Sequence, residues 1–387
     1  MKSMRIVFLS VLLLFLVNMV WGQKSQKPKL TASAIKTSAK IDFGYSMYDS
    51  AITILDNGIQ NYPDDPELHY LLGKAYFFKK NFAGMGEQFA IAESLKSDAK
   101  WMEEVKTVQK EVWSQVFNQG ATAFNEKNYD TALVKFSSCN IIDRSNYRGF
   151  LYLGLSYTMK NEFDQAIAAL KTGLKLSPDN PEILKGYGDV LLFAGKEKEA
   201  LEEYKKVLEK DLKNQEILIN IVAIYSTAKD YDQALVYSQK LVEADPAYKD
   251  GHFNMGTIYL QKIVNTTTAL DSLKDKSGEY LKDEKSTARI KELTEKKNEY
   301  LASAQAAFEK TLQIDSTDLE AQVYLCQVYQ EEGNIDKALT ILEPLVQKDS
   351  TNCDALSQLA IIYAKQGVGD KAKETWKKAQ DCMNKPK

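Results

Sequence analysis

The sequence predicts an all-α solenoid of stacked helix-turn-helix units, and two regularities lead to this fold class. Four residues stand 34 positions apart: Gly154, Gly188, Val222 and Gly256. Each directly follows a large apolar residue, and a leucine or tyrosine comes three positions after it. Twelve positions after the first three of these markers comes a small residue: Ala166, Ala200 and Ala234. A unit of this length cannot bury its own apolar face, so neighbouring units must supply one continuous core.

Each half of the best-defined unit has the pattern of a helix. In residues 147–159 apolar side chains recur at helical spacing, and a polar corner follows at residues 160–162. In residues 164–176 Ala166, Ile167 and Leu170 lie on one stripe, and Pro178 cannot continue the helix. We therefore expect two antiparallel helices in each unit.

The unit that begins at Gly154 resembles the tetratricopeptide repeat, through Leu153-Gly154-x2-Tyr157-x8-Ala166-x3-Leu170-x7-Pro178. This resemblance implies a right-handed α-solenoid. Carried along the chain, the frame gives about nine repeats, with the marker at Ala39, Gly73, Gly120, Gly154, Gly188, Val222, Gly256, Cys326 and Ala360. The fit is weakest in the first repeat, where Asp42 replaces the usual tyrosine.

The frame also predicts the organisation of the chain. Repeats one and two occupy residues 32–98, a helical insertion occupies 99–112, and repeats three to nine occupy 113–386. A second insertion, about 269–300, falls inside repeat seven and contains eight acids, eight bases and regularly spaced leucines. We expect it to form an antiparallel helical arm that turns near Ser277 and Gly278. The arm is either a docking element or an inert extension.

The N-terminus has the features of a secretory signal peptide in residues 1–22. Lys2 and Arg5 precede an apolar run, and Val20-Trp21-Gly22 offers a cleavage site. Residues 23–31 are then a flexible leader. We expect a periplasmic protein, or one in the secretory lumen if the source is eukaryotic, with no membrane insertion after signal removal. The alternatives are a secreted protein and one anchored by an uncleaved N-terminal helix.

Charge and composition argue against several functional classes. Without Lys2 and Arg5 the chain has 48 basic and 53 acidic residues, a formal charge of −5. An acidic chain lacks the positive field that binds phosphates, so no nucleic-acid partner is expected. His69 and His252 fall at the fourth position of their repeats, where other repeats carry packing residues. We expect no metal, no cofactor and no enzyme activity.

The four cysteines fall into two groups. Cys353 begins the first helix of the last repeat and Cys382 ends its second helix, so antiparallel folding brings them together. A disulfide there would staple the terminal hairpin; the alternative is that both remain reduced. Cys139 and Cys326 stand at helix-crossing positions, where packing explains them.

The resemblance implies that the first helices line a concave groove. Its candidate peptide-binding or partner-binding residues are Tyr70, Lys74, Phe78, Phe117, Asn118, Phe124, Tyr152, Lys185, Asn220, Phe253 and Asn254. Asparagine recurs three times at the sixth position, and its amide pairs with both the donor and the acceptor of an extended backbone. The aromatic residues add apolar contact area; alternatively, they pack between layers.

The same resemblance argues against a clamp for C-terminal carboxylates, because Asp189 stands where such a clamp needs asparagine. The leading hypothesis is a non-enzymatic scaffold of the cell envelope that holds a peptide segment or a partner subunit in the groove. The second is a structural component of an envelope or secretion assembly that docks through its outer face and helical arm. A hydrolase with an unfamiliar site is the third. The oligomeric state is left open.

Overall fold

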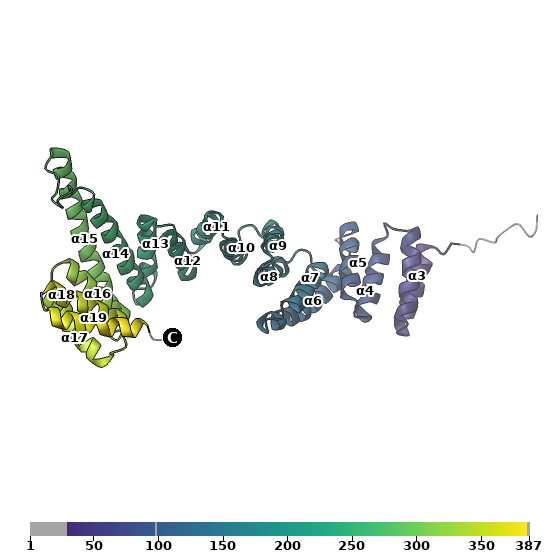
Figure 1. The fold of residues 1–387 in the computed structure, drawn as a ribbon. Helices are drawn as coiled ribbons and strands as arrows, with labels where there is room; N and C mark the ends of the chain where they lie inside the picture. The colour runs from purple at the N-terminus through teal and green to yellow at the C-terminus, as the bar shows by residue number, and fades with distance from the viewer. Residues whose placement is uncertain (1–28, 97–98, 385–387) are drawn as a thin grey trace, which may run out of the picture. The chain divides into compact units, whose positions relative to one another are not determined.

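The computed structural model describes residues 29–96 and 99–384, and over this range the chain is built from α-helices that pack pairwise (Figure 1). The pairs are α2 (Ala32–Gly44) with α3 (Tyr48–Asn61), α4 (Pro66–Phe78) with α5 (Phe82–Leu95), α6 (Met102–Asn125) with α7 (Tyr129–Ile142), α8 (Tyr147–Met159) with α9 (Phe163–Leu176), α10 (Pro181–Phe193) with α11 (Glu197–Lys210), α12 (Gln215–Thr227) with α13 (Tyr231–Ala244), α14 (Lys249–Asp271) with α15 (Glu284–Ile314), α16 (Leu319–Glu331) with α17 (Ile335–Lys348), and α18 (Cys353–Lys365) with α19 (Gly369–Met383). These nine hairpins of the described range confirm the predicted fold class.

The chain divides into two compact units, one ending at Pro178 and the other beginning at Asp179. The first contains α2 to α9 and the second α10 to α19. The predicted signal peptide and most of the predicted leader lie outside the described residues. No helix of the described segments is long and apolar enough to cross a membrane.

The corners between paired helices follow the sequence period. Outside the arm, the second residue after each first helix has a positive φ, and this position is occupied by Ser46, Lys80, Lys127, Asn161, Gly195, Lys229, Gly333 and Gly367. Glycine enters this left-handed conformation without steric cost, whereas the other residue types are held there by the flanking helices.

The marker glycines are explained by close contact with the second helix of the same repeat. A Cβ at Gly188 would lie 2.6 Å from the Tyr204 ring, and the marker glycines of four other repeats face Phe89, Phe136, Leu170 and Phe308 in the same way. Repeat six reverses the sizes, because Val222 takes the marker position and Ser238 the facing one. Both are buried, so the volume of the pair is shared differently between the two helices.

The two insertions extend existing helices. α6 runs without a break through the first insertion into repeat three. In the second insertion α14 and α15 lie side by side as an arm (Figure 1), with Leu270 and Leu293 buried. The turn at its tip is ordered by the pairing of Lys274 with Tyr280 and by a positive φ at Gly278. Leu281 stays 40% exposed because it lies in this turn and not on the helical stripe.

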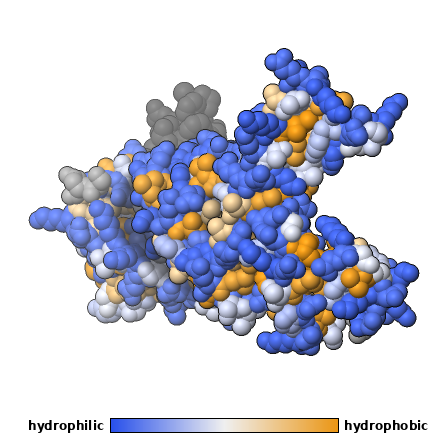
Figure 2. Space-filling model, turned by 90° about the vertical axis from the view of Figure 1, so that its left-hand side faces the viewer, coloured by the Kyte–Doolittle hydropathy of each residue, from blue (hydrophilic) through white to orange (hydrophobic). Residues whose placement is uncertain are grey.

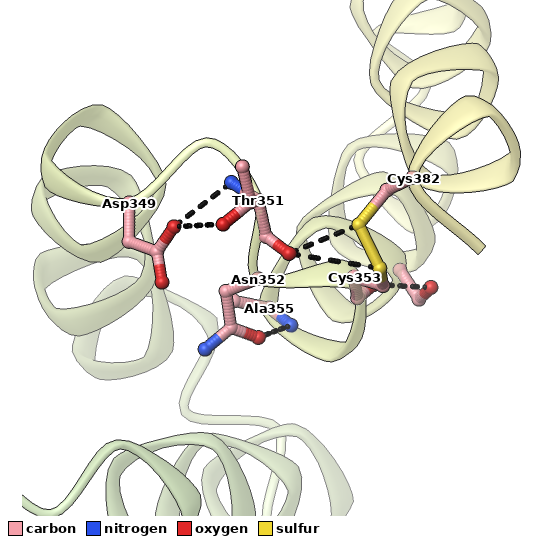
Figure 3. Close-up of a disulfide and its surroundings, with 7 residues drawn as sticks. Asp349, Thr351, Asn352, Cys353, Ala355 and Cys382 are labelled. Carbon is pink, nitrogen blue, oxygen red and sulfur yellow. Dashed lines mark hydrogen bonds between the residues drawn. A yellow bond between two sulfur atoms is a disulfide. The ribbon is translucent and has the colours of Figure 1, made fainter. Parts of the chain in front are cut away.

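Of the two alternatives for the last hairpin, the structure contains the disulfide between Cys353 and Cys382, whose Cα atoms lie 5.5 Å apart. Figure 3 shows that it joins the start of α18 to the end of α19, with the Thr351 carbonyl against both sulfurs. Cys139 and Cys326 are free and buried, and burial raises the pKa of each thiol to about 12. They are packing residues, as their positions predicted.

The two histidines contribute to the junctions between repeats. Nε2 of His69 lies 2.8 Å from the Pro63 carbonyl oxygen, and Nε2 of His252 lies 3.0 Å from that of Pro246. Gln322, at the fourth position of repeat eight, donates to the Ser316 carbonyl in the same way. In these three repeats a polar residue at the fourth position therefore ties the first turn of a helix to the loop that precedes it.

Candidate binding surface on the first helices

In repeat two the predicted groove residues are engaged by the first insertion. The Tyr70 ring stacks on Trp101 at a centroid distance of 4.7 Å, and its hydroxyl donates to Glu104. Burial and this hydrogen bond raise the pKa of Tyr70. Lys74 pairs with the other oxygen of Glu104 at 2.7 Å. Tyr70 is only 8% exposed, so the prediction that it contacts a partner is wrong: the insertion covers it.

Phe78 behaves differently, because its side chain is 42% exposed. One face of the ring stacks on Tyr48 at 4.7 Å, and Phe43 lies 6.3 Å away. Phe78 therefore belongs to a small aromatic cluster at the corner of repeat one, where a partner can still reach it.

Repeats three and four bring Phe117 and Tyr152 together. Their rings meet edge to face at 5.0 Å, and Phe117 also stacks on Trp113 at 4.6 Å. Both Phe117 and Tyr152 remain partly exposed. Asn118, which follows Phe117 in α6, is exposed, and within the described range no residue hydrogen-bonds to its side chain. Phe124 is also partly exposed but lies against Tyr129, in the corner of repeat three.

In the second unit Lys185 is already neutralised by the protein itself. Its Nζ lies 3.0 Å from Asp189 and 2.8 Å from Glu216 of the next repeat. Burial acts to lower the pKa of Lys185, but the two carboxylates outweigh it, and the pKa is raised. A C-terminal carboxylate would have to displace one of these partners, which is the physical reason why that ligand is not expected.

Asn220 and Tyr204 complete this network. The Tyr204 hydroxyl donates to Asp189 at 2.7 Å and accepts from the Asn220 amide at 3.3 Å. Burial and the hydrogen bond to Asp189 raise the pKa of Tyr204. The Asn220 amide thus helps to position a buried tyrosine, and its pairing with a peptide backbone stays a prediction.

Repeat seven presents Phe253 and Asn254. Phe253 meets the rings of Phe308 and Tyr324 at 5.9 and 5.7 Å and is partly exposed. The Asn254 side chain is also partly exposed, and no hydrogen-bond partner for it occurs among the described residues. Of the three sixth-position asparagines, Asn118 and Asn254 thus keep their amides available.

A hollow that the sequence analysis missed lies between α16 and α18. It measures about 220 Å³ and is lined by Leu319, Glu320, Val323, Tyr324, Gln327, Asn352, Asp354, Ser357 and Gln358. Most of these residues occupy the second, fifth, sixth and ninth positions of repeats eight and nine. The signal was therefore available: the same frame, continued for two more repeats, identifies them.

Neither a metal-ligand cluster among the described residues nor, on the face shown in Figure 2, one dominant apolar surface is present. No group of three or more His, Cys, Asp or Glu within the described segments is placed to hold a metal ion. On the face shown in Figure 2, hydrophobic residues form patches separated by hydrophilic ones. Available amides, partly exposed aromatics and the hollow are among the features that the described surface offers for recognition.

Comparison with known proteins gives matches to models of the tetratricopeptide repeat at residues 157–223, 298–352 and 215–248. Among curated proteins, the chain is 24% identical over 223 residues to the TPR repeat-containing protein YpiA of Bacillus subtilis (strain 168), which covers 51% of each chain. It is 26% identical over 164 residues to the BBSome complex member BBS4 of Bos taurus, covering 41% of this chain and 30% of that protein. The chain thus spans about half or less of the length of these relatives.

Among solved structures, a tetratricopeptide repeat protein from Parabacteroides merdae aligns with 70% of this chain and 93% of its own, at 13% identity and a TM-score of 0.41. The period of 34 residues, the pairwise packing of the helices and the matched segments agree with one another. On these grounds residues 157–248 and 298–352 form tetratricopeptide repeats, and the other helix pairs of the described residues follow the same frame.

Proposed function

We propose that this protein is an exported, non-enzymatic scaffold of the cell envelope that binds an extended peptide segment or a partner subunit on its first-helix surface. The observation that carries the proposal is the pairing of available amides with partly exposed aromatics. Asn118 lies beside Phe117 in the first unit, and Asn254 lies beside Phe253 in the second.

This pairing fits the chemistry of an extended backbone. A side-chain amide donates one hydrogen bond and accepts another, so it can pair with a peptide group of any sequence. A neighbouring ring adds apolar contact area and limits the orientation of the bound segment. Repeat proteins of this kind generally act as interaction scaffolds, which supports binding over catalysis.

Export rests on the N-terminal signal and is supported by the disulfide in the last repeat, since disulfides persist mainly in oxidising compartments. Mass spectrometry of the purified native protein tests it. A mature N-terminus at Gln23 is expected; an intact Met1 or a cytoplasmic location would contradict it.

The binding proposal is tested by replacing Asn118 and Asn254 together with alanine. Tagged protein is cross-linked in the native envelope, and the captured partners are quantified by mass spectrometry. We expect the double variant to lose the main partner, because the available amide of each unit is removed and neither unit can then pair with the partner's backbone. The matched control replaces Asn57 of α3 and Gln239 of α13, whose amide side chains are exposed on second helices outside the arm. Equal capture by both variants would contradict the proposal.

The ordered tip of the arm favours a second candidate, docking through the arm. Tyr280 is exposed at this tip, and its ring lies 5.2 Å from the Lys274 ammonium. Deleting residues 270–297 removes the buried Leu270 and Leu293 together, so the repeats are expected to stay folded. Loss of the partner from this variant alone would establish the arm as the docking element.

A further inference from the structure

In two repeats the fifth residue of the first helix is a lysine that pairs with a carboxylate of the next repeat. Lys36 and Lys185 both stand at the fifth position of their repeats. Each reaches the carboxylate at the second position of the next repeat: Lys36 lies 3.1 Å from Glu67, and Lys185 lies 2.8 Å from Glu216. The fifth-position ammonium thus neutralises an acid that the following repeat presents.

Repeat eight has the acid without the lysine. Its fifth residue is Val323, and the second residue of repeat nine is Asp354. Both line the hollow between α16 and α18, together with Glu320. Of the described residues that line this hollow, none carries a positive charge, and within the described range neither carboxylate has an ion-pair partner. The hollow therefore lies where Lys185 extends in repeat five.

The size and the walls of the hollow suit one long side chain. Its volume of about 220 Å³ is below the ~300–1,000 Å³ typical of small-molecule sites. The Tyr324 ring is fixed by stacking on Phe308 at 5.7 Å. Gln358 is fixed as well, because its carbonyl oxygen accepts from the Gln330 amide at 2.8 Å. Aliphatic carbons of a ligand would contact Val323 and the tyrosine ring, and its charged end would meet the carboxylates.

We propose that this hollow binds a lysine side chain of the partner peptide, whose ammonium takes the place that Lys185 takes in repeat five. The proposal rests on the proposed function and names the chemistry of the partner: an extended segment with a lysine. The Phe253 ring lies 5.7 Å from that of Tyr324, so the surface that carries Asn254 adjoins the hollow. The backbone of the segment crosses α14 while its lysine enters between α16 and α18.

A first experiment needs no ligand. The V323K variant supplies the ammonium from within the chain, and V323M is the matched control of similar length without charge. An uncompensated charge at a buried position is strongly destabilising. If the hollow accepts a cation, the melting temperature of V323K stays within about 3 °C of that of V323M. Adding D354N then lowers the melting temperature of V323K more than that of V323M. The proposal would be overturned if V323K melts far below V323M and if D354N lowers the melting temperature of both variants equally.

A second experiment uses a phage-displayed library of random ten-residue peptides as the probe. We expect the wild-type protein to enrich peptides with a lysine at one position. Synthetic versions with Nε-acetyl-lysine there should bind about tenfold or more weakly, since a charge-assisted contact is lost. V323K and D354N should weaken binding similarly, whereas D336N, which changes a first-turn carboxylate of the second helix α17 outside the hollow, should not.

The outcomes separate the two proposals. Selected peptides that bind without a lysine preference, or that bind V323K as well as wild type, refute the lysine site and leave peptide binding standing. A library from which no peptide is enriched contradicts both. Preference for arginine over lysine would also refute the proposal, because the group that pairs with the carboxylate in repeats one and five is a lysine ammonium.

Discussion

In the second unit, repeats five and eight differ at the fifth position of the first helix. Repeat five fills this place with a charged side chain, whereas repeat eight leaves a hollow there. In repeat five, Tyr204 holds Asp189, and Asp189 with Glu216 holds Lys185, so the fifth position is filled. In repeat eight the equivalent residues are Leu342, Gln327 and Val323, and a hollow remains beside Asp354. Two repeats with the same pairing of helices thus differ at three side chains. These side chains fill the fifth position in repeat five and leave a hollow there in repeat eight.

The two repeats also differ in the role of their charged groups, which stabilise the fold in repeat five and stay available for binding in repeat eight. The network of repeat five satisfies its own charges, so an incoming ligand would have to displace an internal partner. The hollow of repeat eight leaves two carboxylates to water, and a bound cation would displace only solvent. Removing parts of either arrangement tests this contrast.

The largest effect is expected for Tyr204→Ala. The side chain is fully buried against Gly188, and its loss leaves a cavity and frees Asp189, at a cost of about 3–5 kcal/mol. Hydrogen exchange measured by mass spectrometry should show protection lost first in α10 to α13. Tyr237→Ala, which removes a partly exposed tyrosine of α13, is the control and should cost much less. Similar losses in both variants would mean that the network does not anchor repeat five.

Breaking the disulfide with Cys353→Ser and Cys382→Ser should have the next largest effect. The bridge closes a loop with a sequence separation of 29, and such a loop contributes roughly 3–4 kcal/mol. Because the bridge holds the start of α18, which is one wall of the hollow, exchange should rise in α18 and α19 and not in α10 to α13. Reduced wild-type protein should behave like the double variant. Unchanged hydrogen exchange in both would contradict a stabilising role of the disulfide.

The smallest effect on stability is expected for Lys185→Val, which gives repeat five the fifth residue of repeat eight. The ion pairs of Lys185 are partly exposed, so the loss should stay below about 1 kcal/mol. The variant should gain a second lysine-accepting site, detected by increased binding of the selected lysine peptides at low salt. Lys198→Val, on the exposed side of α11, is the control. A variant that unfolds, or that binds no better than the control, would break the analogy between the two repeats.

Much of the fold was predictable because each repeat is local in sequence. The positions of the markers, the helix pairs and the meeting of Cys353 with Cys382 all follow from a fixed period and antiparallel hairpins. The candidate surface was less predictable. Tyr70 is covered by Trp101, which belongs to an insertion outside the period, and Asn220 donates to Tyr204 of the preceding repeat. Neither contact can be read from the position of one residue within its own repeat.

Spacing along the chain is enough to predict the paired helices, the start of each repeat and the residues that face the first-helix surface. Which of those residues stay available depends on the folded chain. Availability depends on side chains from neighbouring repeats that neutralise, cover or leave open each position. Lys185 is neutralised by Glu216, Tyr70 is covered by Trp101, and Val323 leaves room beside Asp354, since a short side chain cannot reach the carboxylate of the next repeat.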